Sequence, residues 1–205
     1  MDILERLFGS AAKVKIIKLY LFNPEVAFDV AEVAKRAKVS FGSARREISN
    51  LEKIDFIKPR IFSKEITRQK NRKIESSKKR VNGWTLNPKF SHIEAIKSFL
   101  SSINPFEHRD IINKISRAVK VQLLIISGIF IKNPDSRVDL LVVGDDLKQN
   151  QLDNVIKIIE SEIGKEIRYA SFETSEFKYR YAMFDKLIFD ILDSPNKKII
   201  NKLNL

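Results

Sequence analysis

The chain of 205 residues contains no cysteine and only two histidines, His92 and His108. Without thiols it can form no disulfide, use no cysteine nucleophile and hold no metal through thiolates. Neither histidine has a second potential ligand nearby at metal-binding spacing, which argues against a zinc enzyme or a histidine-based catalytic triad. The lack of cysteine fits the reducing environment of the cytoplasm.

Long apolar segments are also missing. No apolar run reaches the roughly 18–20 residues that a membrane-spanning helix needs. The chain begins Met1-Asp2-Ile3-Leu4-Glu5-Arg6, with an early acid and no apolar core of the kind that a signal peptide has. The sequence therefore predicts a soluble cytoplasmic protein that does not use a membrane as a partner.

Acidic residues are scarce in the first part of the chain. The formal net charge is +12, from 38 basic and 26 acidic residues. Residues 1–90 hold 21 basic and 10 acidic residues, a net charge of +11, whereas residues 91–205 hold 17 and 16. This asymmetry predicts a polyanion-binding module joined to a nearly neutral one, and a lysine-rich solvated surface is the alternative.

The apolar spacing in the first 53 residues predicts a series of short helices. Apolar residues from Leu4 to Leu21 recur every three or four positions, as in an amphipathic helix, with Gly9-Ser10 ending one helix and capping the next. Asp29 is expected to cap a second helical segment, since Glu32 follows three residues later. Ser40 is expected to cap a third, which runs to about Lys53.

A basic hairpin is expected after these helices. Residues 56–62 and 81–86 have the pattern of strands, with Pro59 marking an edge, and a polar segment, 63–80, lies between them. Residues 58–80 contain ten basic and two acidic residues. Helices followed by such a hairpin predict a winged helix-turn-helix, in which one helix enters the major groove and the hairpin follows the phosphate backbone. A solvated loop with no partner is the alternative.

The predicted DNA contacts lie on one face of the third helix and along the hairpin. If Ala44, Ile48 and Leu51 are buried, helical periodicity places the polar residues on the opposite face. Arg46 is the best candidate for a bidentate guanine contact, and small serines near the helix start favour a phosphate. The complete predicted set is Ser40, Gly42, Ser43, Arg45, Arg46, Ser49, Lys53, Lys58, Arg60, Lys64, Arg68, Lys70, Arg72, Lys73, Lys78, Lys79 and Arg80.

The second half has a different pattern. Residues 121–126 and 138–143 are nearly continuous apolar runs, as expected of strands buried on both faces. A helix over 152–163, a strand near 167–171 and helices near 174–182, 184–192 and 196–203 should follow. The predicted fold class is α+β: a winged helix-turn-helix domain at 1–90, a helical connector at 91–120 and a small α/β domain at 121–205.

Two resemblances sharpen these predictions. Residues 1–90 resemble the N-terminal winged-helix domains of a family of prokaryotic transcriptional regulators, above all in the stretch Ser43-Ala44-Arg45-Arg46-Glu47-Ile48-Ser49-Asn50-Leu51-Glu52. Residues 121–193 resemble the minimal nucleotidyltransferase fold, in the segments 125–130, 136–144 and 164–169. Active members of that second family place a Gly-Ser turn after the first strand and then two acids, separated by one apolar residue, that hold Mg²⁺.

The transferase motif is incomplete in this sequence. Gly128 is present without the serine, Arg137 occupies the first acid position, and only Asp139 matches the second. Arg168 stands where a third acid is expected. One carboxylate beside an arginine is a poor magnesium site, so the resemblance implies a retained fold with no catalytic residues, no metal and no cofactor. The alternative is that Asp145, Asp146 or Glu166 rebuilds a metal site. We expect Asp139 to pair with Arg137 or Lys132, or to cap a local turn.

Taken together, these features predict a sequence-specific DNA-binding transcriptional regulator that is not an enzyme. Its partners would be double-stranded DNA and a second copy of the chain, with the C-terminal domain serving for dimerisation, sensing or docking of a protein partner. The first alternative is an active nucleotidyltransferase with an autoregulatory winged helix. The second is an antitoxin-like partner of a toxin.

Overall fold

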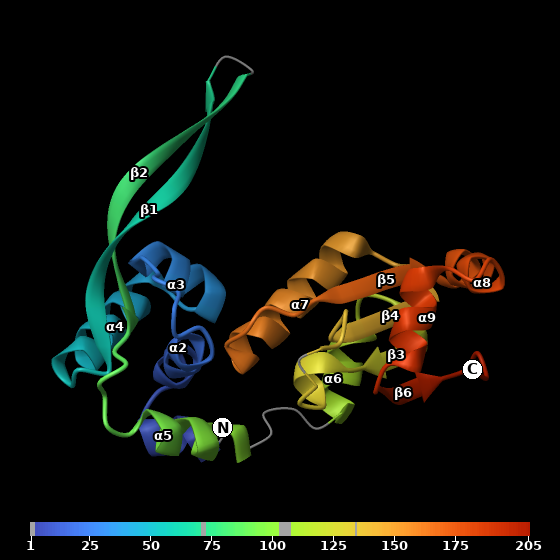
Figure 1. Cartoon of the computed structure of the whole chain (residues 1–205), viewed down its shortest axis with the longest axis horizontal. Coiled ribbons are helices and arrows are strands. Elements are labelled where there is room, and N and C mark those ends of the chain that lie inside the picture. Colours follow the sequence, from blue (N-terminus) through green and yellow to red (C-terminus); the bar gives the residue numbers. More distant parts are fainter. Residues whose placement is uncertain (1–2, 71–72, 103–107, 134) are drawn as a thin grey trace. The chain divides into compact units, whose positions relative to one another are not determined.

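The computed structural model describes residues 3–70, 73–102, 108–133 and 135–205. The protein is a mixture of helices and strands, so the predicted α+β class is confirmed (Figure 1). The chain divides into two compact units: Met1–Asn104 with Glu160–Lys165, and Pro105–Ile159 with Glu166–Leu205. Among the helices of the described residues, none combines the length and apolarity needed to cross a bilayer.

The described residues of the first unit include the helices α1 (Ile3–Phe8), α2 (Ala11–Phe22), α3 (Val30–Ala37), α4 (Phe41–Lys53) and α5 (Ile93–Ser102). The break between α1 and α2 was predicted correctly. Gly9 has a φ of +81°, and Ser10 caps α2 by accepting the N–H of Lys13 at 2.9 Å. Helix α2 is not amphipathic, however, because residues on all its sides are buried: Val14, Ile16, Ile17, Lys18, Leu19, Tyr20 and Leu21.

The hairpin is much longer than the sequence predicts. Strands β1 (Ile57–Lys70) and β2 (Lys73–Leu86) pair antiparallel from Ile57↔Leu86 to Lys70↔Lys73, so residues 63–70 and 73–80 are strand rather than loop. At about 3.4 Å per residue, strands of 14 residues form a ribbon of about 45 Å. Within its unit, the twisted ribbon projects well beyond α3 and α4 (Figure 1).

A compact core joins the base of the hairpin to the helices. Phe28 makes an isolated antiparallel bridge to Trp84, which ties the segment before α3 to the base of the ribbon. Tyr20, Phe28 and Phe56 are at most 1% exposed, and Trp84 packs against this cluster. A two-stranded ribbon alone is marginally stable in water, so this anchoring is what supports the projecting part.

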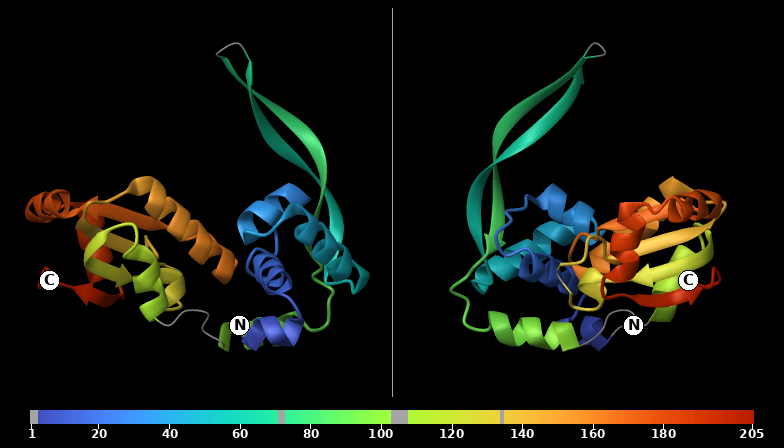
Figure 2. Two further views of the ribbon diagram at one scale, coloured as in Figure 1. Left: turned by 180° about the vertical axis from the view of Figure 1, so that it is seen from behind. Right: turned by 45° about the vertical axis from the view of Figure 1, so that its right-hand side comes forward.

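The second unit is built on a four-stranded sheet of order β5-β4-β3-β6 (Figure 2). Its described elements are α6 (His108–Ile115), β3 (Lys120–Ile126), the 3₁₀ turn η1 (Gly128–Phe130), β4 (Leu140–Asp145), α7 (Gln149–Ile163), β5 (Tyr169–Glu173), α8 (Thr174–Ala182), α9 (Lys186–Asp193) and β6 (Lys197–Asn201), except that the last turn of α7, from Glu160, belongs to the first unit. Strands β4 and β5 are parallel, and β3 is antiparallel to both β4 and β6. The predicted helix at 196–203 is wrong, because this segment pairs with β3 as an edge strand.

Both faces of this sheet are buried, as the apolar runs predict. On one face Leu123, Ile125 and Leu141 pack with Phe177 of α8 and Ile188 of α9. The side chains that alternate with these along β3 and β4, and so point to the other face of the sheet, are also buried: Leu124, Ile126, Leu140 and Val142. Because β4 and β5 are parallel, α7 must cross over between them, and its buried line of Leu152, Ile156 and Ile159 covers this second face.

Candidate functional site

Helix α4 presents a polar face to solvent. Ala44, Ile48 and Leu51 are at most 2% exposed, so the predicted buried line is confirmed. The opposite side is open: Phe41, Gly42, Arg45, Arg46, Ser49, Asn50 and Lys53 are exposed, and Ser43 is half-buried. The side chain of Arg46 is 68% exposed, which leaves its guanidinium accessible.

The start of α4 is capped from within. Ser40 Oγ accepts the backbone N–H of Ser43 at 3.1 Å and donates to Ser43 Oγ at 2.9 Å. The N–H of Ser43 is therefore already bonded. A phosphate at this helix start would have to use the N–H groups of Phe41 and Gly42 instead.

Helix α4 also carries a buried carboxylate, Glu47, on its inner face, and the sequence did not predict this. Glu47 is 3% exposed and accepts hydrogen bonds from Ser10 Oγ at 3.2 Å and Asn50 Nδ2 at 3.4 Å. Lys13 Nζ and Arg46 Nε lie 3.8 Å from its oxygens. Glu47 thus ties α4 to the capped start of α2 and restrains the root of the Arg46 side chain.

Two further residues on the open face were also missed. Phe41 is 56% exposed at the first position of α4, and Asn50 lies one turn after Arg46. Asparagine pairs with adenine, and an apolar side chain contacts the methyl of thymine, so both types suit a major-groove helix. The spacing of four residues from Arg46 to Asn50 was the signal that could have identified Asn50.

The hairpin cations fall into groups with different surroundings. At the base, Arg60 Nη1 donates to the carbonyl of Glu25 at 3.2 Å, and Lys58 is exposed beside it. Farther out, Lys78, Lys79 and Arg80 are exposed, and in the described part of the chain none of the three has an ion-pair partner. Of the other predicted contacts, Arg72 lies outside the described residues, as do the side chains of Arg68, Lys70 and Lys73.

Lys64, one of the predicted DNA contacts, forms ion pairs at the start of helix α3. Its Nζ lies 2.6 Å from Oδ2 of Asp29, the N-cap of α3, and 3.5 Å from Oε2 of Glu32, in the first turn of that helix. Burial alone would raise the pKa of Asp29, but hydrogen bonds from Lys64 and from the backbone of Glu32 outweigh it and lower that pKa. The hydrogen bond to Asp29 raises the pKa of Lys64. This ion pair fastens the hairpin to the helices.

The Asp29–Lys64 pair gives the first unit a defined pH dependence. We expect Lys64→Gln to lower its free energy of unfolding by about 1 kcal/mol at pH 7. The lowered pKa of Asp29 stabilises the fold above the ordinary carboxyl pKa, and this contribution is lost as the pH falls through the folded value. The raised pKa of Lys64 contributes below the ordinary amine pKa and is lost as the pH rises through the folded value.

The measurement is urea unfolding followed by the fluorescence of Trp84, the single tryptophan, across pH. The difference between wild type and Lys64→Gln should be constant between about pH 5 and 9 and should shrink toward zero below about pH 4. A difference that persists undiminished at pH 3 would contradict this assignment.

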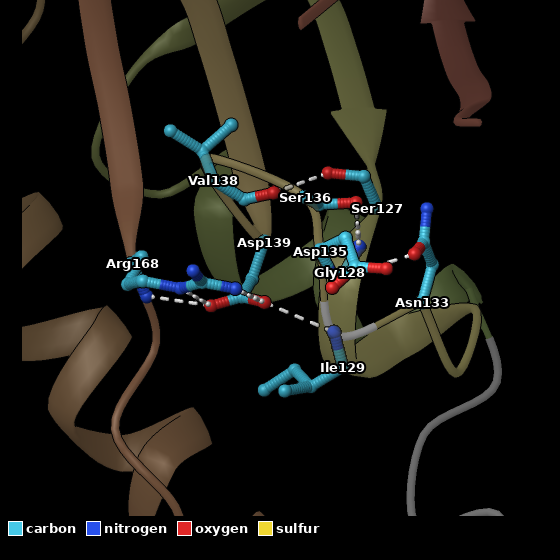
Figure 3. Close-up of polar contacts among 9 residues, drawn as sticks. All are labelled: Ser127, Gly128, Ile129, Asn133, Asp135, Ser136, Val138, Asp139 and Arg168. Atoms are coloured by element: carbon cyan, nitrogen blue, oxygen red, sulfur yellow. Dashed lines mark hydrogen bonds and ion pairs between the residues drawn. The ribbon is translucent and has the colours of Figure 1, made fainter. Parts of the chain in front are cut away.

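In the second unit, Asp139 is enclosed by donors (Figure 3). Its carboxylate is 1% exposed, and Oδ1 accepts from the backbone N–H of Ile129 at 2.9 Å and from Arg168 Nη2 at 3.2 Å. Oδ2 accepts from the backbone N–H and the Nε of Arg168, at 2.9 and 3.2 Å. Each oxygen therefore has two donors, which fills the positions that a metal ion would need.

The expected partner of Asp139 was wrong. The ion pair is made by Arg168, whereas Arg137 Nη1 pairs with Asp190 Oδ2 at 3.1 Å. The alternative that Asp139 caps a local turn is confirmed, because the N–H of Ile129 belongs to the turn η1. Adjacent strands bring Asp139 and Arg168 together, and linear spacing does not reveal this: Asp139 N donates to the carbonyl of Arg168 at 2.6 Å.

Gly128 is needed here for Asp139. Its φ is +53°, and a Cβ at this position would lie 1.9 Å from Asp139 Oδ1, so no other residue fits. Its N–H donates to Ser136 Oγ at 3.1 Å. Across the described ranges, no group of three or more acids and histidines is placed to hold a metal ion.

No protein family, curated protein or solved structure matches this chain.

Proposed function

We propose that the chain is a sequence-specific DNA-binding regulator whose first unit is a winged helix-turn-helix. The observation that carries the proposal is the open polar face of α4, with Arg46 and Asn50 one turn apart, immediately followed by a basic ribbon. In this assignment α3 and α4 form the helix-turn-helix, and α4 reads base edges in the major groove. The β1–β2 ribbon is the wing and lies along phosphates.

The charge of the first 90 residues supports the same assignment. Their net charge of +11 is most of the chain's +12. Exposed cations such as Lys78 and Lys79 provide affinity for any duplex through counterion release, whereas α4 provides the sequence preference.

We propose further that the second unit carries out no nucleotidyl transfer. In support, the Asp139 carboxylate already accepts hydrogen bonds from the Arg168 side chain and from the backbone N–H groups of Ile129 and Arg168. Asp139 precedes β4, whereas Asp145 and Asp146 lie at the other end of that strand, about 20 Å away along the chain, and cannot complete a metal site with Asp139. Lys120 Nζ already pairs with Asp146 at 2.7 Å.

The direct test is selection of duplexes from a random pool by the full chain, followed by sequencing. We expect an enriched motif, and Arg46→Ala should relax the preference at one base position at a loss of about 1–3 kcal/mol in discrimination. Arg137→Ala is the matched control and should leave the motif unchanged. A pool that stays random would contradict sequence-specific binding, and calorimetric binding of ATP with Mg²⁺ would favour the transferase instead.

Gly42 provides a second prediction. It lies in the first turn of α4 with φ in the ordinary range, and a Cβ added there would meet no atom of the protein within 4 Å. Gly42→Ala should therefore raise the free energy of unfolding by about 0.5–1 kcal/mol, since glycine is a poor helix former.

The same substitution should weaken DNA binding, because a methyl group would intrude where the duplex backbone approaches α4. Thermal unfolding and fluorescence anisotropy on one preparation measure both effects. A variant that is more stable and binds DNA as tightly as wild type would show that no duplex approaches α4 at Gly42.

A further inference from the structure

The corner between α8 and α9 holds a column of aromatic rings that runs from the core to the surface. Phe177 and Tyr181 stack with ring centroids 6.2 Å apart, Tyr181 and Phe189 are 5.3 Å apart with an interplanar angle of 8°, and Phe189 and Phe184 are 5.5 Å apart. Phe177 is 1% exposed, whereas Phe184 is 79% exposed. The outer end of the column is therefore open to solvent.

The backbone at the outer ring is strained. The N–H of Phe184 donates to the carbonyl oxygen of Tyr181 at 3.1 Å, and the N–H of Asp185 donates to the carbonyl oxygen of Arg180 at 3.0 Å. This is the Schellman end of a helix, in which the residue at the Phe184 position adopts a left-handed conformation and is usually glycine. Here a phenylalanine adopts it, with φ of +53°. Phe184 thus exposes a large ring to solvent while its backbone adopts a left-handed conformation that is unfavourable for a residue with a side chain.

Three further large side chains at the end of α8 are exposed. Tyr179 is 67% exposed, Met183 64% and Tyr181 37%. At about 200 Å² for a large side chain, these residues and Phe184 leave about 500 Å² open to solvent, which is more than half of the about 800 Å² that each partner contributes to a standard interface. Tyrosine, phenylalanine and methionine are the types enriched at the centres of interfaces.

The local charge indicates what can cover this surface. Residues 174–193 carry three basic and four acidic residues, a net charge of −1, in a chain whose net charge is +12. Arg180 is paired with Glu176 at 2.8 Å and with Asp185 at 3.2 Å. Residues 91–205 as a whole hold 17 basic and 16 acidic residues, so two copies can meet through the second unit without the repulsion that the net charge of +11 on residues 1–90 produces. Flat ring faces also complement one another across a two-fold axis, where the same patch meets itself.

We propose that the α8–α9 corner, defined by Tyr179, Tyr181, Met183, Phe184 and Phe189, is the surface through which two copies of the chain associate. The inference deepens the proposed function, because a dimer presents two α4 helices to paired half-sites, but it is tested without DNA. Phe184 is the central contact, stacking on the column of the second copy.

The test is sedimentation velocity of the full chain from about 1 to 100 µM, a range that brackets moderate dimer affinities. Wild type should dimerise, and Phe184→Gly should weaken association at least about tenfold, the typical loss for a central contact. Phe184→Trp, which keeps a ring, should retain the dimer. Leu7→Ala, at a side chain 65% exposed in the first unit, is the control and should also retain it.

A stability measurement separates this role from a structural one. Because glycine relieves the strain at this position, Phe184→Gly should unfold at a higher urea concentration than the wild-type monomer while losing the dimer. Wild type that stays monomeric at 100 µM would overturn the proposal, as would a Phe184→Gly dimer of unchanged affinity. Single-site DNA binding by monomeric Phe184→Gly reports on the proposed function separately.

Discussion

Replacing Lys78, Lys79 and Arg80 together by glutamine should weaken binding to any duplex by about 100- to 1,000-fold near 0.1 M salt. These cations are exposed and have no ion-pair partner within the described residues, so each is available to displace one condensed counterion. Losing three phosphate contacts should also lower the slope of log K against log salt by about 2.7. Fluorescence anisotropy with a labelled duplex measures both quantities.

The matched control replaces three exposed lysines of the second unit, Lys148, Lys157 and Lys202, by glutamine. Both triple variants reduce the net charge from +12 to +9. We expect the control to keep nearly the wild-type affinity and slope. Equal losses in the two variants would mean that the bulk charge of the chain, rather than the ribbon, attracts DNA.

Asp139→Ala should lower the free energy of unfolding of the second unit by about 3 kcal/mol. The substitution removes a buried carboxylate, leaves the N–H groups of Ile129 and Arg168 without that acceptor and opens a cavity beside Gly128. Urea unfolding followed by far-ultraviolet circular dichroism measures this loss. Trp84 lies in the first unit, so its fluorescence should report an unchanged transition in the same sample.

Arg137→Ala supplies the contrast for this experiment. Arg137 and Asp190 are 54% and 36% exposed, and a pair so open to water contributes less than about 1 kcal/mol. An Asp139→Ala protein as stable as wild type would show that this carboxylate does not stabilise the fold. That result would favour the nucleotidyltransferase alternative.

Some features were predictable because they depend only on residues close together in the sequence. Asp29 and Ser40 start helices by accepting the N–H of the residue three positions later, a pattern visible in the sequence. The buried line of α4 follows from helical periodicity, and the apolar runs of β3 and β4 from burial on both faces.

Other features depend on contacts between distant residues. The ribbon extends to Lys70↔Lys73 because its two strands satisfy each other's backbone groups, and its outer part needs no apolar alternation. The segment 197–201 became a strand because β3 offers a free edge. Asp139 and Arg168 meet only through the pairing of β4 with β5, and the buried position of Glu47 depends on its contact with Ser10.

The central claim is that the first unit binds duplex DNA through α4 and the ribbon. The most direct measurement is the affinity of the wild-type chain for a labelled duplex between about 50 and 200 mM salt. Six or more phosphate contacts predict a loss of about 10³-fold or more over that range. Affinity that is undetectable at about 50 mM salt, or that does not change with salt, would contradict the account.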